Sequence, residues 1–130
     1  MEPQQARSQA ALGIILANEH KFDSALSPLG KALELDEKSW EARWALARCY
    51  YVQRKFQPAL EQSQRALNDS NGQAPDIILV VAASLTALGQ YEQSAGMLRE
   101  YLEKYSDRAG AARARRWLDR LQQSGKINQN

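Results

Sequence analysis

The feature that most constrains how this chain can fold is a pattern of small and aromatic residues that recurs along it. Gly13, Ala47 and Ala82 are separated by 34 and 35 positions. In every copy an aromatic residue, a second small or hydroxyl-bearing residue and a leucine then follow in the same order: Phe22, Ala25 and Leu33; Phe56, Ala59 and Leu67; Tyr91, Ser94 and Leu102. A fixed period of this length is typical of a supersecondary unit that stacks on copies of itself. The sequence therefore predicts three stacked units.

Within each unit the apolar residues recur at helical spacing, as in the stripe of Ala10, Ile14 and Ala17. No window alternates apolar and polar residues as a β-strand would. Breakers such as the turn cluster at 68–72 separate the apolar stripes. Pro28 falls inside one predicted helix, and we expect it to kink or delay that helix. The pattern predicts helices near 3–18, 22–35, 39–53, 57–69, 75–88, 91–104 and 107–123.

The repeated segments resemble the tetratricopeptide repeat family. KFDSALSPLGKALELD and RKFQPALEQSQRALND are close matches, and GQYEQSAGMLREYLEKY is a looser one. The resemblance covers residues 6–108 and implies an all-α, right-handed solenoid of antiparallel helix hairpins, in which only Gly or Ala fits where two helices cross closely. We expect repeats at 6–39, 40–73 and 75–108, a capping helix at 107–123 with Asp107 as its N-cap, and a flexible tail at 124–130.

The chain departs from the family pattern at several positions. The tryptophan usual early in the first helix of a repeat is replaced by Gln9, Arg43 and Ile78. The N-terminal side shows no cap comparable to the C-terminal helix, so we expect further repeats or another domain upstream in a longer protein. This unprotected first hairpin also suggests an alternative function, self-assembly or docking within a larger protein.

The resemblance implies that the first helix of each hairpin lines a concave groove in which a partner segment lies. Projected onto this chain, the groove is lined by Arg7, Ala10, Ile14 and Ala17, by Glu41, Trp44, Arg48 and Tyr51, and by Asp76, Leu79, Ala83 and Thr86. Trp44, Arg48 and Tyr51 share one helical face and are of types enriched in binding hot spots. We hypothesise that they anchor a partner protein or peptide. The alternative is that Trp44 fills space between repeats and that Arg48 pairs with Glu41 or Asp76.

A subset of the family uses groove lysines and asparagines to clamp the C-terminal carboxylate of chaperones. The matching places here hold Ala10, Ile14, Trp44 and Leu79, so no chaperone clamp is expected. A mixed apolar segment, either an amphipathic helix or an extended strand, fits such a groove better.

The end of the chain is basic, although the chain as a whole is nearly balanced, with 17 basic and 15 acidic residues. Arg113, Arg116 and Arg120 share a face of the predicted capping helix, opposite its apolar stripe. These arginines could contact phosphate, nucleic acid or an anionic surface. The alternative, which we favour because the footprint is small, is a solvated cap face. Nucleic acid is therefore disfavoured as a partner.

Nothing in the sequence favours catalysis. His20 is the only histidine and is expected in a solvent-facing turn, and Cys49 is the only cysteine, so neither a disulfide nor a cysteine metal cluster can form within the chain. No glycine-rich phosphate loop is present. We predict no enzymatic activity, no cofactor and no metal.

The sequence makes the cytoplasm the default location. It has a lone cysteine, no apolar run long enough to span a membrane and a start unlike a signal peptide. The periplasm stays open if the chain is a piece of a longer protein.

Overall fold

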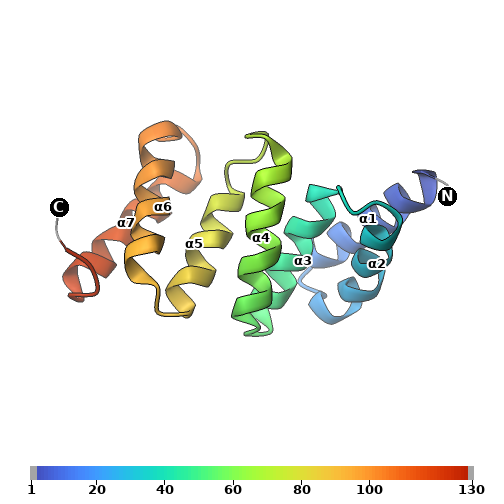
Figure 1. Ribbon diagram of the computed structural model, residues 1–130, viewed down its shortest axis with the longest axis horizontal. Helices are drawn as coiled ribbons and strands as arrows, with labels where there is room; N and C mark the ends of the chain where they lie inside the picture. Colours follow the sequence, from blue (N-terminus) through green and yellow to red (C-terminus); the bar gives the residue numbers. More distant parts are fainter. Residues whose placement is uncertain (1–2, 129–130) are drawn as a thin grey trace.

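A computed structural model describes residues 3–128, and these residues form seven α-helices and no β-strand. Figure 1 shows the helices stacked along the long axis of the molecule in chain order. Their bounds are α1 (Pro3–Asn18), α2 (Phe22–Leu35), α3 (Trp40–Val52), α4 (Phe56–Ser70), α5 (Ile77–Ala87), α6 (Tyr91–Lys104) and α7 (Gly110–Gln123). The predicted all-α fold is confirmed.

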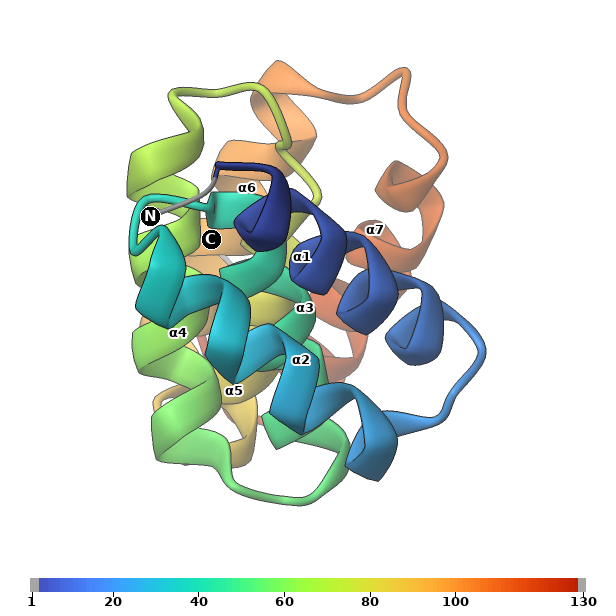
Figure 2. The ribbon, with the colours of Figure 1, turned by 90° about the vertical axis from the view of Figure 1, so that its right-hand side faces the viewer.

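Successive helices pair into hairpins, α1 with α2, α3 with α4 and α5 with α6, and α7 packs against α6. The first helices of neighbouring hairpins also contact one another, α1 with α3 and α3 with α5. Seen from the N-terminal end (Figure 2), α4 lies on one side of the stack and α7 on the other. The row of α1, α3 and α5 therefore runs through the stack, with α7 beside it on the side away from α4.

The small residues of the repeat stand where two helices come closest. A Cβ atom built on Gly13 would lie 2.5 Å from both Cγ and Cδ2 of Leu29, on the partner helix of the first hairpin. Ala47 and Ala82 are fully buried at the matching positions of the next two hairpins. Because real carbon atoms do not approach to 2.5 Å, the crowding that the sequence pattern implied is present in the fold.

Each hairpin turns through one residue with a left-handed backbone. His20, Arg54 and Gly89 have φ of 63°, 63° and 80° and lie 34 and 35 positions apart, in register with the repeat. The turn between α4 and α5 uses a different solution, with Asn71 and Gly72 at φ of 51° and 81°. Of these three turn residues, only Gly89 adopts the left-handed backbone without steric cost, because glycine has no Cβ atom.

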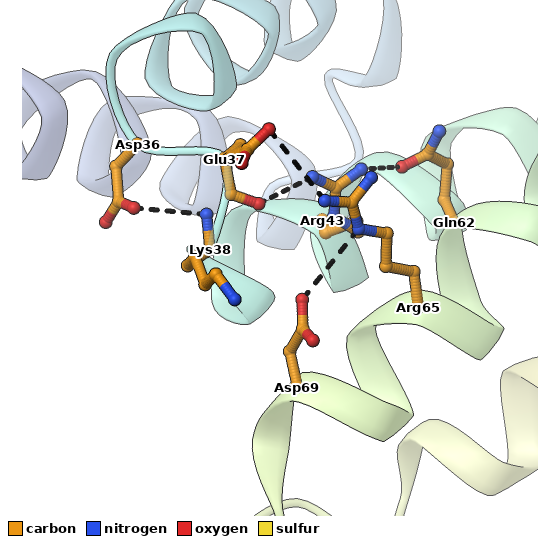
Figure 3. Close-up of polar contacts among 7 residues, drawn as sticks. All are labelled: Asp36, Glu37, Lys38, Arg43, Gln62, Arg65 and Asp69. Atoms are coloured by element: carbon orange, nitrogen blue, oxygen red, sulfur yellow. Dashed lines mark hydrogen bonds and ion pairs between the residues drawn. The ribbon is translucent and has the colours of Figure 1, made fainter.

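Arg43 takes the place of the tryptophan that the repeat family favours, and it is buried between the first and second hairpins. Its side chain is 7% exposed. As Figure 3 shows, Nη1 donates to Oε1 of Gln62 at 2.7 Å, and Nη2 donates to the main-chain oxygen of Glu37 at 2.6 Å. Arg65, with a half-exposed side chain, forms longer ion pairs with Glu37 and Asp69, both at 3.9 Å. Arg43 thus joins the α2–α3 connection to α4 from within the stack.

One local expectation is wrong in part and another is wrong. Pro28 does not delay α2, which begins at Phe22 and runs without interruption to Leu35. The proline ring is buried, so packing in the hairpin outweighs the missing hydrogen bond. Asp107 is not the N-cap of α7: the chain remains in a turn until Ala109, and the helix begins at Gly110. A Cβ atom at Gly110 would lie 2.6 Å from the Tyr101 hydroxyl, so this helix start requires glycine.

Residues 124–128, which the sequence analysis places in a flexible tail, pack against the last hairpin. Ile127 is 6% exposed and belongs to a core cluster with Leu98 and Leu121. The Lys126 ammonium lies 4.9 Å from the centroid of the Tyr91 ring, at the start of α6. This short segment therefore contributes an apolar side chain to the core of the last hairpin. Residues 129 and 130 lie outside the described part of the chain.

Candidate binding groove

A groove with a volume of about 930 Å³ lies between α3, α5 and α7, and we call it the inner groove. Trp44, Arg48 and Tyr51 line it from α3, and Leu79 and Ala83 line it from α5. The turn between α1 and α2 closes one end. The groove therefore collects side chains from all three hairpins and from the capping helix.

The inner groove brings together only part of the predicted set. Trp44, Arg48, Tyr51, Asp76 and Leu79 line it, together with Ala17, Ala83 and Thr86. The remaining predicted residues, Arg7, Ala10, Ile14 and Glu41, line a second groove of about 650 Å³. This second groove lies beside the α2–α3 connection, and Trp40, the first residue of α3, also lines it.

The capping helix contributes to the inner groove as well. Arg113 and Arg120 line it, whereas Arg116 is exposed outside its lining. Trp117 lies between them on the same helical face and also lines the groove. Trp117 is not among the site residues expected from the sequence, although its spacing of four residues from Arg113 and three from Arg120 places it on their helical face.

Trp44 both packs and lines the groove. Its side chain is half-buried against the core cluster that includes Leu60, Val81 and Leu85. The Arg48 guanidinium carbon lies 5.8 Å from the centroid of the indole ring. Packing between repeats, which the sequence analysis weighed as an alternative for Trp44, is thus present together with its position in the groove.

Arg48 contacts neither of the carboxylates considered for it. Nη1 donates to Oδ1 of Asn18 at 3.1 Å, across the gap between α3 and the end of α1. Asn18 is neutral, so the contact leaves the charge of Arg48 uncompensated. Burial lowers the pKa of Arg48, although the guanidinium stays protonated at any ordinary pH. Arg48 therefore presents a partly desolvated positive charge to the groove.

Two buried donor atoms in this region have no acceptor among the described residues. They are Nε1 of Trp44 and Nε of Arg48. A buried donor without a partner costs free energy, and such groups are rare in folded proteins.

Asp76 is the carboxylate of the groove, and it is already engaged. Its Oδ1 accepts from the hydroxyl of Tyr101 at 2.7 Å and from Nε of Arg108 at 3.0 Å. Burial raises the pKa of Asp76, but the hydrogen bonds from Arg108 and Tyr101 outweigh burial, so its pKa lies below the ordinary value. Burial and the contact with Asp76 raise the pKa of Tyr101. The three residues join the start of α5 to the end of α6 and the turn after it.

We expect Asp76→Asn to lower the free energy of unfolding by about 1 kcal/mol at pH 7, after allowance for the partial exposure of the carboxylate. A depressed pKa contributes stability above the unfolded-state value of about 4, and that contribution is lost as pH falls through it. The gap between wild type and variant should therefore narrow below about pH 4. Urea unfolding from pH 7 to pH 3 measures it, with the exposed Asp119→Asn as control. A gap that stayed constant over this range would contradict the assignment.

Cys49 and His20, the one cysteine and the one histidine of the sequence, lie in different environments. Cys49 is fully buried, and burial raises the pKa of its thiol against the opposing effect of Arg48. His20 is exposed at the end of the groove and lies edge-on to Phe22, with 5.6 Å between ring centroids.

No helix within residues 3–128 combines the length and apolar character needed to cross a bilayer.

Three helix hairpins in a fixed register, with small residues at the crossings and a closing helix, define a tetratricopeptide-type helical repeat protein. Residues 18–101 match the family described as anaphase-promoting complex, cyclosome, subunit 3, which is built from repeats of this type. The match spans more than half of the chain, and the chain belongs to this family. None of the curated proteins compared with the chain matches it.

Proposed function

We propose that the protein is an interaction module that holds a segment of a partner protein in the inner groove, without catalysis. One observation carries the proposal: Trp44, Arg48, Tyr51 and Trp117 converge on a single groove from two different helices. Indole, phenol and guanidinium groups in a concave surface are the usual anchors of protein interfaces. A rigid groove of this kind binds a flexible segment without ordering itself first.

Two further observations support a protein partner. The family takes its name from a subunit of a complex, which agrees with a role in contacting other proteins. The floor of the groove, with Leu79 and Ala83, is apolar, as expected for a surface that takes apolar side chains of a peptide. We also propose that the three repeats span residues 6–39, 40–73 and 75–108.

Selection from a random peptide library tests the groove. Peptides selected on the wild-type protein are expected to bind Trp44→Ala about 10- to 100-fold more weakly, because hot-spot anchors contribute about 2 kcal/mol or more. Tyr51→Ala, which removes an exposed side chain, should also weaken binding. The matched control is Trp40→Ala, which removes the same side chain from the same helix but at the second groove.

Affinities are measured by fluorescence anisotropy, and circular dichroism confirms that each variant is folded. If the selected peptides bound Trp44→Ala and Tyr51→Ala as tightly as wild type, the inner groove would not be the binding site. Loss of binding in Trp40→Ala alone would assign the site to the second groove instead.

Self-assembly is a second candidate, and it rests on one specific observation. Leu12 and Ile15 lie three residues apart on α1 and are 48% and 54% exposed, so they form a small apolar surface on this helix. Such a surface suits a second copy or an adjoining domain. Light scattering over a range of concentrations distinguishes the two candidates, since a mass that stays monomeric throughout counts against self-assembly.

A further inference from the structure

The charges that line the inner groove are unbalanced. Three guanidinium groups reach it, from Arg48 on α3 and from Arg113 and Arg120 on α7. The carboxylate that lines it, Asp76, is already bound by Arg108 and Tyr101. The groove therefore presents an excess of positive charge that its own acid does not neutralise.

Within the described residues, the three groove arginines form no ion pair, unlike Arg65 and Arg108. Arg65 pairs with Glu37 and Asp69, and Arg108 pairs with Asp76. The hydrogen bond of Arg48 goes to neutral Asn18, and its buried Nε has no acceptor there. The hydrogen bond to Asn18 uses Nη1 alone, so the guanidinium group keeps Nη donors that can form a charge-assisted hydrogen bond to a carboxylate.

Apolar and aromatic surface lies between these charges. Trp44 stands beside Arg48 on α3, and Trp117 stands between Arg113 and Arg120 on α7, with Leu79 of α5 between the two helices. Guanidinium groups and aromatic side chains therefore line the groove from both α3 and α7. A ligand that matches it must carry anionic groups separated by apolar ones.

We infer that the segment bound in the inner groove is an acidic peptide, in which Asp or Glu carboxylates pair with Arg48, Arg113 and Arg120 while apolar side chains between them contact Trp44 and Trp117. This inference rests on the proposed function and adds the chemistry of the partner. A nucleic acid fits less well, because three arginines around an apolar floor match few backbone phosphates, and affinity for nucleic acid scales with the number of phosphates contacted.

The test uses a fluorescein-labelled peptide, acetylated and amidated, that repeats Glu-Glu-Leu over about twelve residues. Its matched control carries Gln at every Glu position. We expect the Glu peptide to bind at least about 10-fold more tightly than the Gln peptide at low salt, and this advantage to shrink as salt screens the charges. Equal affinity of the two peptides would overturn the inference.

Single variants locate the contact. Arg48→Gln, Arg113→Gln and Arg120→Gln should each weaken binding of the Glu peptide by about 3- to 10-fold, as expected for loss of one partly exposed ion pair. Arg116→Gln removes the same charge from α7 outside the groove and should change the affinity by less than about 2-fold. An equal loss in all four variants would mean a diffuse attraction and no defined site.

Two other outcomes separate this inference from the proposal beneath it. If library-selected peptides require Trp44 but carry neutral or basic residues, the groove binds a protein segment and the acidic chemistry is wrong. If no selected peptide requires Trp44 or Tyr51, the proposed function fails and this inference fails with it. Tighter binding of a single-stranded oligothymidine than of a peptide of equal charge would favour nucleic acid and overturn the inference.

Discussion

Replacing Gly13 by leucine is expected to lower the free energy of unfolding by about 3 kcal/mol. A Cβ atom at this position would already lie 2.5 Å from two carbon atoms of Leu29 and 3.2 Å from its main-chain nitrogen. Leu29 is fully buried, so moving its side chain would displace the residues packed around it. The two helices of the first hairpin would have to separate, and the packing of α1 against α2 would be lost along part of their length.

The matched control is Gly96→Leu. Gly96 also lies inside a helix, α6, but is exposed, and a Cβ atom built on it would meet nothing within 4 Å. There the substitution should stabilise the protein by up to about 1 kcal/mol, because leucine has the higher helix propensity. Urea unfolding monitored by circular dichroism compares the two. Similar effects at both positions would show that crowding is not the reason for the glycine.

Much of the fold could be predicted from the sequence because the repeat pattern depends on residues that are close together in the chain. The small residue at Gly13 and the aromatic at Phe22 mark the helix crossing and the turn of one hairpin, and their copies mark the others. The start of α7 could not be predicted in this way. It depends on the close approach of Gly110 to Tyr101, and Arg108 in the preceding turn reaches a carboxylate 32 residues away. Local pattern favoured Asp107, but these tertiary contacts decided the boundary.

The candidate groove was predictable only within one helix. Spacing of three and four residues places Trp44, Arg48 and Tyr51 on one face of α3, and they lie together in the inner groove. Spacing within a helix says nothing about how α7 faces α3, so the sequence left Arg113 and Arg120 as a separate patch and passed over Trp117. The sequence also could not show that Arg7 of α1 and Glu41 of α3 line the second groove and not the inner groove.

The buried arginine between the first two hairpins leads to the second large effect. Arg43→Ala is expected to lower the free energy of unfolding by about 3 kcal/mol. The substitution removes two hydrogen bonds from a charged donor and leaves the main-chain oxygen of Glu37 and the amide oxygen of Gln62 without that donor. It also leaves a void where the side-chain stem packed.

Arg65→Ala is the matched control, since Arg65 lies beside Arg43 (Figure 3) but has a half-exposed side chain with ion pairs at 3.9 Å. It should change stability by no more than about 0.5 kcal/mol.

Arg43→Met separates the contribution of packing from that of the hydrogen bonds, because methionine refills the space without donating hydrogen bonds. Burial lowers the pKa of Arg43. Because desolvating a charge is costly and methionine refills the space, we expect the stability of Arg43→Met to lie between those of wild type and Arg43→Ala. Arg43→Met equal to Arg43→Ala would mean that packing contributes nothing and that hydrogen bonds alone hold this junction together.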